Sequence, residues 1–135
     1  MVKGMTRFLK FWGPVFVYMA LMWYISSRPV GKIAFLRIPF ADKALHIAEF
    51  ALFGYLLARA LSYDRMDEDR ILIPIIVIML GVIWGVIDEI HQLFIPLRNS
   101  SIFDVIADAF GASIGGVILI ARMGLQGRRR DAENS

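Results

Sequence analysis

The sequence predicts an all-α fold: a bundle of four transmembrane helices with both termini in the cytoplasm. Hydrophobic residues make up 58% of the 135 residues, which is too apolar a composition for a soluble domain. Four apolar stretches each approach the roughly 20 residues needed to cross a bilayer. Basic residues gather at the chain ends and in the loops, a pattern that positive-inside topology explains better than nucleic-acid binding.

The first apolar stretch carries aromatic residues of the kind that anchor helices at a membrane interface, Trp12 near one end and Trp23 with Tyr24 near the other. A cleaved signal peptide is the alternative, because basic residues precede the run. The run is long, however, and lacks a clean small-residue cleavage site. The four predicted helices are Phe8–Ile25, Ala44–Leu61, Ile71–Leu93 and Ile102–Ile120.

Basic residues at the two chain ends predict that both termini lie inside. They are Lys3, Arg7 and Lys10, and Arg122, Arg128, Arg129 and Arg130. The loop 62–70 is then cytoplasmic as well, while basic residues in the loop Ser26–Ala41 weaken the bias. We expect one transmembrane domain over residues 1–125, followed by a short, charged and disordered cytoplasmic tail, 126–135.

The loop Ser26–Ala41 alternates apolar with basic residues between Pro29 and Pro39. One interpretation places this loop among the lipid headgroups, where it would bind anionic lipid. The other interpretation packs it over the ends of the helices.

Six carboxylates lie in or at the ends of the last three stretches. A charged side chain at membrane depth costs about 2.5 to 3.5 kcal/mol on insertion scales, so a chain that keeps several together is expected to use them. The second stretch starts outside, the third ends outside and the fourth starts outside, so all six fall in the outer half of the membrane. They are Asp42, Glu49, Asp88, Glu89, Asp104 and Asp108.

Helical spacing groups these polar residues by face. At 1.5 Å per residue, Glu49 lies roughly 10 Å beyond Asp42 and well below the headgroups. The shared faces hold Asp42, His46 and Glu49 on the second helix, Asp88 and Gln92 on the third, and Asp104 and Asp108 on the fourth.

Two glycine pairs continue the stripes of the third and fourth helices. Small residues four apart let membrane helices pack closely, so we expect these pairs to draw Asp88 and Asp108 together. The alternative is that glycines are simply frequent in membrane helices. The pairs are Gly81 with Gly85, and Gly111 with Gly115.

Several polar residues also have a structural interpretation. These are Asp42 as the N-cap of the second helix, Ser101 with Asp104 as a capping box, Glu89 in the outer water, Gln92 bonded across helices, and His91 at the interface. Glu49, Asp88 and Asp108 lie a turn or more inside their helices, which favours function. His46, one turn from Glu49, is suited to proton exchange.

Six acids against Lys43 and Arg98 leave an excess of negative charge. Some carboxylates are therefore protonated, or a cation sits among them. Oxygen ligands suit a hard divalent ion, and His46 with His91 would permit zinc. The spacing matches no metal-binding motif, so we assign no metal ligands, and the cofactor stays unknown. The chain has no cysteine, which excludes thiol chemistry.

These residues also carry a resemblance. The residues that carry it are Asp42, Lys43, His46, Phe50 and Gly54, then Asp88, Glu89, Gln92, Pro96 and Arg98, then Asp104, Asp108, Gly111 and Gly115. Over Asp42–Gly116 the chain resembles the VanZ-like family of bacterial membrane proteins. The family often has glycine between the proline and the arginine, where Leu97 stands here. The resemblance implies a bacterial inner membrane and the cell envelope, and the family's namesake is linked to low-level teicoplanin resistance. It supplies no reaction.

The sequence thus predicts a site that binds or modifies an amphipathic envelope molecule, such as a lipid-linked precursor or a glycopeptide, among membrane lipids. Acid–base or metal-assisted transfer on its headgroup is left open. Arg98 would hold a phosphate or carboxylate. The catalytic candidates are Glu49, Asp88, Asp108 and His46, and the substrate-binding candidates are Arg98, Asp42, Lys43, Glu89, Gln92 and Asp104.

Two other classes remain open. One is a small proton- or cation-coupled transporter, formed as an oligomer. The inner part of the third span, Ile71–Trp84, offers no polar route for transport. The other is a structural membrane protein in which the carboxylates join helices, at about 0.6 kcal/mol per contact.

Overall fold

The computed structural model describes residues 2–29, 41–63, 72–98 and 100–134. They form four helices, α1 Val2–Ser26, α2 Ala41–Leu61, α3 Leu72–Gln92 and α4 Ile102–Glu133, and the described residues contain no strand. Each helix is long and apolar enough to cross a membrane. The predicted all-α, four-helix fold is confirmed.

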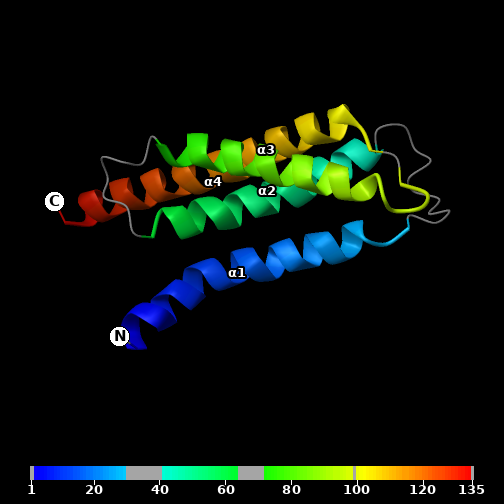
Figure 1. Cartoon of the computed structure of the whole chain (residues 1–135). Coiled ribbons are helices and arrows are strands. Elements are labelled where there is room, and N and C mark those ends of the chain that lie inside the picture. Colours follow the sequence, from blue (N-terminus) through cyan, green and yellow to red (C-terminus); the bar gives the residue numbers. More distant parts are fainter. Residues whose placement is uncertain (1, 30–40, 64–71, 99, 135) are drawn as a thin grey trace.

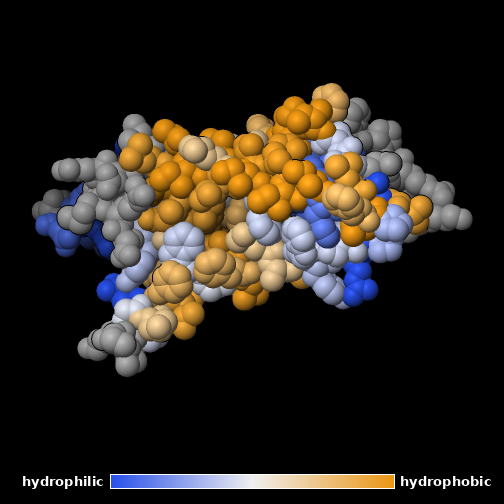
Figure 2. All heavy atoms as spheres, in the orientation of Figure 1, coloured by the Kyte–Doolittle hydropathy of each residue, from blue (hydrophilic) through white to orange (hydrophobic). Residues whose placement is uncertain are grey.

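The helices run alternately up and down, and α1 lies along α2 at the edge of a tighter group formed by α2, α3 and α4 (Figure 1). We call the end where α1 ends, α2 begins, α3 ends and α4 begins the polar end. The opposite end, which holds the beginning of α1 and the end of α4, is the basic end. Apolar side chains cover the middle of the molecule and hydrophilic ones gather at both ends (Figure 2).

Glycines let α2 and α4 approach each other backbone to backbone. A Cβ on Gly115 would lie 2.6 Å from the backbone nitrogen of Tyr55, and a Cβ on Gly54 would lie 2.7 Å from the Cα of Ala112. Such distances leave no space for a side chain, so α2 and α4 form the closest helix pair of the bundle. Large apolar side chains, among them Phe53 and Ile73, fill the rest of the core.

Both glycine pairs pack closely, as predicted, but they contact different helices. Gly111 faces the backbone of Ile47 and Gly115 faces that of Tyr55, both on α2. This pair therefore packs against α2 and not against the glycines of α3. Gly81 and Gly85 instead face α4, where they make room for Ala112 and Asp108. The sequence spacing identified the close packing but did not specify which helix each pair contacts.

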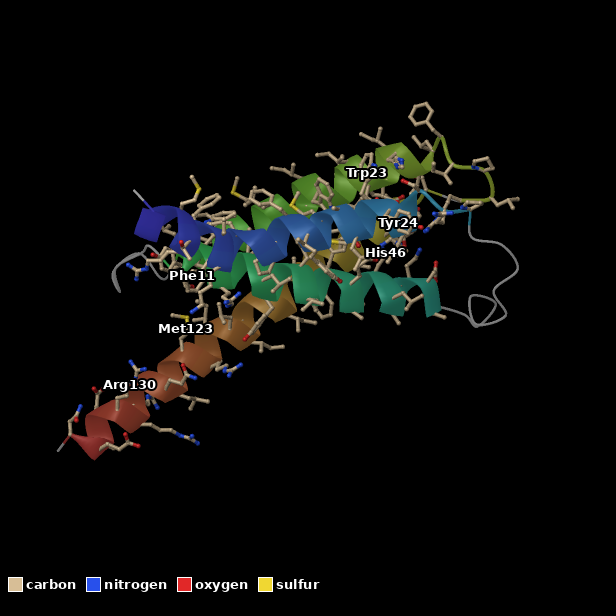
Figure 3. The ribbon with its side chains drawn as sticks, turned by 90° about the horizontal axis from the view of Figure 1, so that it is seen from below. Phe11, Trp23, Tyr24, His46, Met123 and Arg130 are labelled. Atoms are coloured by element: carbon tan, nitrogen blue, oxygen red, sulfur yellow. The ribbon has the colours of Figure 1, made fainter. Side chains whose placement is uncertain are left out.

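The prediction of a disordered tail is wrong, because α4 continues to Glu133. At 1.5 Å per residue its 32 residues extend about 48 Å, which carries Arg130 beyond the other helices (Figure 3). The predicted start of the third span at Ile71, residues 30–40 of the first loop and 64–70 of the second lie outside the described residues. Both interpretations of the first loop therefore stay predictions.

The helix α1 belongs to the folded unit. Val15 and Met22 are buried, and the hydroxyl of Tyr18 donates a hydrogen bond to the backbone carbonyl of Glu49, at 3.1 Å. Near the polar end Trp23 packs against Trp84, with 6.0 Å between ring centroids. These contacts are those of a packed transmembrane helix.

Candidate functional site

All the buried polar and charged side chains that the structure describes lie at the polar end. The last turns of α3 and the first turns of α4 carry most of them, since α3 ends and α4 begins there. They are Ser26, Asp88, Glu89, Gln92, Asp104 and Asp108. Three helices thus bring the polar residues that are far apart in sequence into one cluster.

His46 joins α2 to α4. Its Nδ1 lies 2.8 Å from Oδ1 of Asp108, and its Nε2 lies 3.9 Å from Oδ1 of Asp104. Asp108 is fully buried, and its carboxyl group occupies the space beside Gly85, where a Cβ would lie 2.7 Å from Oδ2. His46, which lies one turn from Glu49 on α2, is therefore hydrogen-bonded to the fourth helix.

Lys43 forms ion pairs with two carboxylates of different exposure. Its ammonium contacts Asp42, at 2.9 Å, and Asp104. The Asp42 side chain is half exposed while that of Asp104 is buried, so Lys43 connects the rim of the cluster to its interior. Since α2 begins at Ala41, Asp42 lies inside the first turn, and its interpretation as an N-cap is wrong.

Ser101 is the N-cap of α4, but the expected capping box is incomplete. Its hydroxyl accepts from the backbone N–H of Phe103, at 3.2 Å. Its own backbone N–H donates to Oε2 of Glu89, at 2.6 Å, rather than to Asp104. A carboxylate from α3 takes the second capping position, so Asp104 is available to Lys43. Glu89 is 5% exposed, which rules out its predicted alternative in the outer water.

Asp88 and Gln92 form a pair within α3. The amide Nε2 of Gln92 donates to Oδ2 of Asp88, at 2.6 Å, so the predicted cross-helix bond of Gln92 is wrong. The two residues are four apart, a spacing that places them on one helix face. The structure describes no hydrogen bond between Asp88 and Asp108.

Three buried carboxylate oxygens have no hydrogen-bond partner among the described residues: Oδ1 of Asp88, Oε1 of Glu89 and Oδ2 of Asp108. The half-buried carboxylate of Glu49 likewise receives no hydrogen bond there. A buried acceptor without a partner costs about 1 to 3 kcal/mol, and more when it is charged. Protons, cations or hydrogen-bond donors that bind these oxygens would therefore stabilise the cluster.

Arg98 anchors the end of α1. Its Nε donates to the carbonyl of Arg28, at 3.2 Å, and its Nη2 to that of Ile25, at 2.9 Å. The carbonyl of Ile25 belongs to the last turn of α1, where helical carbonyls have no partner four residues ahead, and it also accepts from the backbone N–H of Arg28, at 3.0 Å. A guanidinium has five N–H donors, so Arg98 keeps donors for a further partner.

The residue before Arg98 carries a glycine-like backbone. Leu97 has φ of 65°, in the left-handed region that a side chain disfavours. This is the position at which the resembled family often has glycine. The turn therefore keeps the conformation that glycine would adopt more easily.

The second histidine lies apart from the first. His91 stacks against Trp23, with 4.0 Å between ring centroids, and its Nε2 lies 3.4 Å from the hydroxyl of Ser27. His91 thus contacts Trp23 and Ser27 while His46 contacts Asp108, and no described contact joins the two histidines.

Sequence analysis missed a pocket of about 420 Å³ at the basic end. Arg122 donates to the hydroxyl of Tyr55, at 3.1 Å, and Arg59 lies over the ring of Phe11, at 4.9 Å from its centroid. Aromatic residues at three separate points of the chain are its only signal in the sequence. The lining residues are Phe11, Tyr55, Arg59, Ser62, Tyr63, Leu119, Arg122, Met123 and Gln126, and Figure 3 labels Phe11 and Met123 at this end, away from His46.

Four membrane-competent helices with a carboxylate-rich polar end define a small multi-pass membrane protein. The family model described as VanZ/LLP1 matches residues 5–123. Because the match covers most of the chain, the protein belongs to the VanZ/LLP1 family. The match begins well before Asp42, so it includes α1. Neither a curated protein nor a solved structure was found to match the chain.

Proposed function

We propose that the polar end binds the headgroup of an amphipathic molecule of the bacterial cell envelope, from the outer half of the inner membrane. The observation that carries this proposal is the set of buried carboxylate oxygens without partners, on Asp88, Glu89 and Asp108. A headgroup with hydroxyl or amine donors would satisfy them. Both termini then face the cytoplasm, as the basic residues favour.

The surroundings of the cluster fit an amphipathic ligand. Large apolar side chains at the polar end are exposed, including Phe94 at 79% and Phe103 at 66%. In a membrane such side chains contact acyl chains, while the cluster between the helices accepts the polar part. Lys43 at the rim and the remaining donors of Arg98 supply positive charge for a phosphate or carboxylate.

Modification of the headgroup is the second candidate, and the pairing of His46 with Asp108 favours it. A carboxylate that holds one ring nitrogen of a histidine orients the other for proton transfer. The Nε2 of His46 faces the cluster, near Asp104. Acid–base chemistry on a lipid-linked headgroup would use this nitrogen.

Transport and purely structural roles fit the geometry less well. Between the polar cluster and the basic end the described buried residues are apolar, such as Phe53, Leu57 and Val77. A proton or cation would find no polar path there. A purely structural role would leave no buried carboxylate oxygen unpaired, yet one oxygen each of Asp88, Glu89 and Asp108 accepts no hydrogen bond within the described chain.

Native mass spectrometry of the purified protein tests the proposal with a polyprenyl diphosphate-linked sugar and with phosphatidylglycerol. We expect wild type to retain the lipid-linked sugar preferentially. Glu49→Gln, which removes a charge without changing shape, should weaken retention about tenfold, equivalent to about 1.4 kcal/mol.

Arg122→Met, at the basic end, is the matched control and should bind as wild type does. Equal retention by Glu49→Gln and wild type would contradict the proposal, as would a loss confined to Arg122→Met. The family link to glycopeptides adds a cellular readout. Expression in a teicoplanin-sensitive bacterium should lower its susceptibility, and Glu49→Gln should abolish that change.

A further inference from the structure

Three side chains at the polar end come from three different helices and converge. They are His46 of α2, Glu89 of α3 and Asp104 of α4, and each has a possible ligand atom within 4.8 Å of those of the other two. Glu89 and Asp104 are about 95% buried, and His46 is mostly buried. One imidazole and two carboxylates form a ligand set that divalent transition metals accept.

The hydrogen bond of His46 prepares it as a ligand. An ionised carboxylate only accepts hydrogen bonds, so with Asp108 ionised the contact of 2.8 Å assigns the proton to Nδ1. Nε2 then carries the lone pair, and it lies 3.9 Å from Oδ1 of Asp104. Metal-bound histidines typically donate their other N–H to a carboxylate in this way, which fixes the tautomer and the ring orientation.

Glu89 supplies an independent observation, a buried carboxylate oxygen that is fixed next to the other two side chains. Its Oε2 accepts from the backbone N–H of Ser101, at 2.6 Å, and this bond holds the carboxylate in place. Its Oε1 is buried and has no partner among the described residues. A charged acceptor in this position needs a cation or a proton.

Lys43 is the cation that already approaches the trio. Its ammonium contacts Asp104 and also Asp42, and its side chain remains 26% exposed. Lys43 can therefore move toward Asp42 and water when another cation occupies the position beside Asp104. The two cations compete for the same carboxylate.

We propose that Nε2 of His46, Oε1 of Glu89 and the carboxylate of Asp104 bind a divalent transition metal ion, with Zn²⁺ preferred over Mg²⁺. The nitrogen ligand gives this preference, because Mg²⁺ favours oxygen and water. Three protein ligands leave a coordination position open. No sequence motif predicted the site because the ligands belong to three separate helices. The proposal goes beyond headgroup binding and stands without it.

Isothermal titration of the purified, EDTA-treated protein with ZnCl₂ and with MgCl₂ tests this site. Wild type should bind Zn²⁺ one-to-one and Mg²⁺ much more weakly. Glu89→Gln should weaken Zn²⁺ binding by about tenfold or more, although the glutamine keeps an acceptor for the N–H of Ser101. His46→Gln, which keeps a donor for Asp108, should do the same and serves if Glu89→Gln fails to fold.

Two further variants separate this site from a general attraction of cations to acids. Glu49→Gln removes a neighbouring charge that lies outside the trio, so it should weaken Zn²⁺ binding much less than Glu89→Gln does. Lys43→Met removes the competing cation and should tighten Zn²⁺ binding. No stoichiometric Zn²⁺ in wild type, equal losses in Glu49→Gln and Glu89→Gln, or no tightening in Lys43→Met would each overturn the proposal.

Discussion

The polar end and the rest of the bundle are built from opposite kinds of contact. In the middle and toward the basic end, Phe53, Leu57 and Ile73 are almost completely buried, and glycines bring α2 against α4. At the polar end the buried polar side chains are four acids, an amide and a serine hydroxyl, and several of their oxygens are unpaired. The apolar part therefore carries the stability of the fold, and the polar end carries groups that reduce it.

This difference has a functional meaning. Unpaired buried carboxylates are costly in a membrane, and a protein that tolerates them gains something other than stability. The basic end is charged too, but Arg122 and Arg59 pair there with a hydroxyl and an aromatic ring. Charge alone does not distinguish the two ends. The ends differ because only the polar end, among the described residues, holds buried carboxylate oxygens without partners.

Substitution in the close-packed middle should have the largest effect. A Cβ on Gly115 would meet backbone atoms of Ala51 and Tyr55, and a backbone cannot move aside as a flexible side chain can. We expect Gly115→Ala to destabilise the fold by about 3 kcal/mol, measured as thermal unfolding in detergent by circular dichroism.

The adjacent glycine is the control. A Cβ on Gly116 would lie 3.4 Å from Cγ1 of Val77, an ordinary contact distance. Gly116→Ala should therefore be neutral or slightly stabilising, since alanine favours helix more than glycine does. Similar behaviour of the two variants would mean that the glycines do not hold α2 and α4 together.

Removal of a charge at the polar end should increase the stability of the fold. Glu49 is half-buried and its carboxylate receives no hydrogen bond within the described chain. Glu49→Gln should raise the free energy of unfolding by about 1 kcal/mol, which is typical when a costly group kept for function is replaced. Scanning fluorimetry should show a higher melting temperature.

Glu133→Gln makes the same chemical change on the exposed last turn of α4 and should leave the melting temperature unchanged. A clear loss of stability in Glu49→Gln would identify Glu49 as a paired structural group. The proposed site would then be restricted to Arg98 and the rim of the polar end.

The sequence was sufficient to predict the helices and the grouping of the acids, because hydrophobic length and helical spacing are local properties. It could not predict partners that depend on how helices rotate against each other. Spacing along α2 placed His46 one turn from Glu49, but only the packing of α2 on α4 shows that its hydrogen-bond partner is Asp108. Spacing along α4 paired Ser101 with Asp104, whereas Glu89 reaches across from α3.

The end of α4 shows a different limit. Composition predicted disorder after Gln126, because the segment is charged and has no apolar face. The helix nevertheless continues to Glu133, since no proline interrupts it and its basic last turn suits the negative end of the helix dipole. The basic-end pocket was missed because it depends on α1 meeting α2 and α4, and no local pattern predicts that meeting.

The smallest effect is expected at the turn that presents Arg98. Leu97 is 77% exposed and has φ of 65°, so its side chain contributes little packing while its backbone is strained. Leu97→Gly should be more stable than Leu97→Ala by about 0.5 kcal/mol, because both remove the exposed side chain and only glycine removes the Cβ. Chemical denaturation of the two variants in the same detergent measures the difference. If Leu97→Ala is as stable as Leu97→Gly, the backbone at this position is not strained. The leucine then needs no explanation from the way the turn holds Arg98.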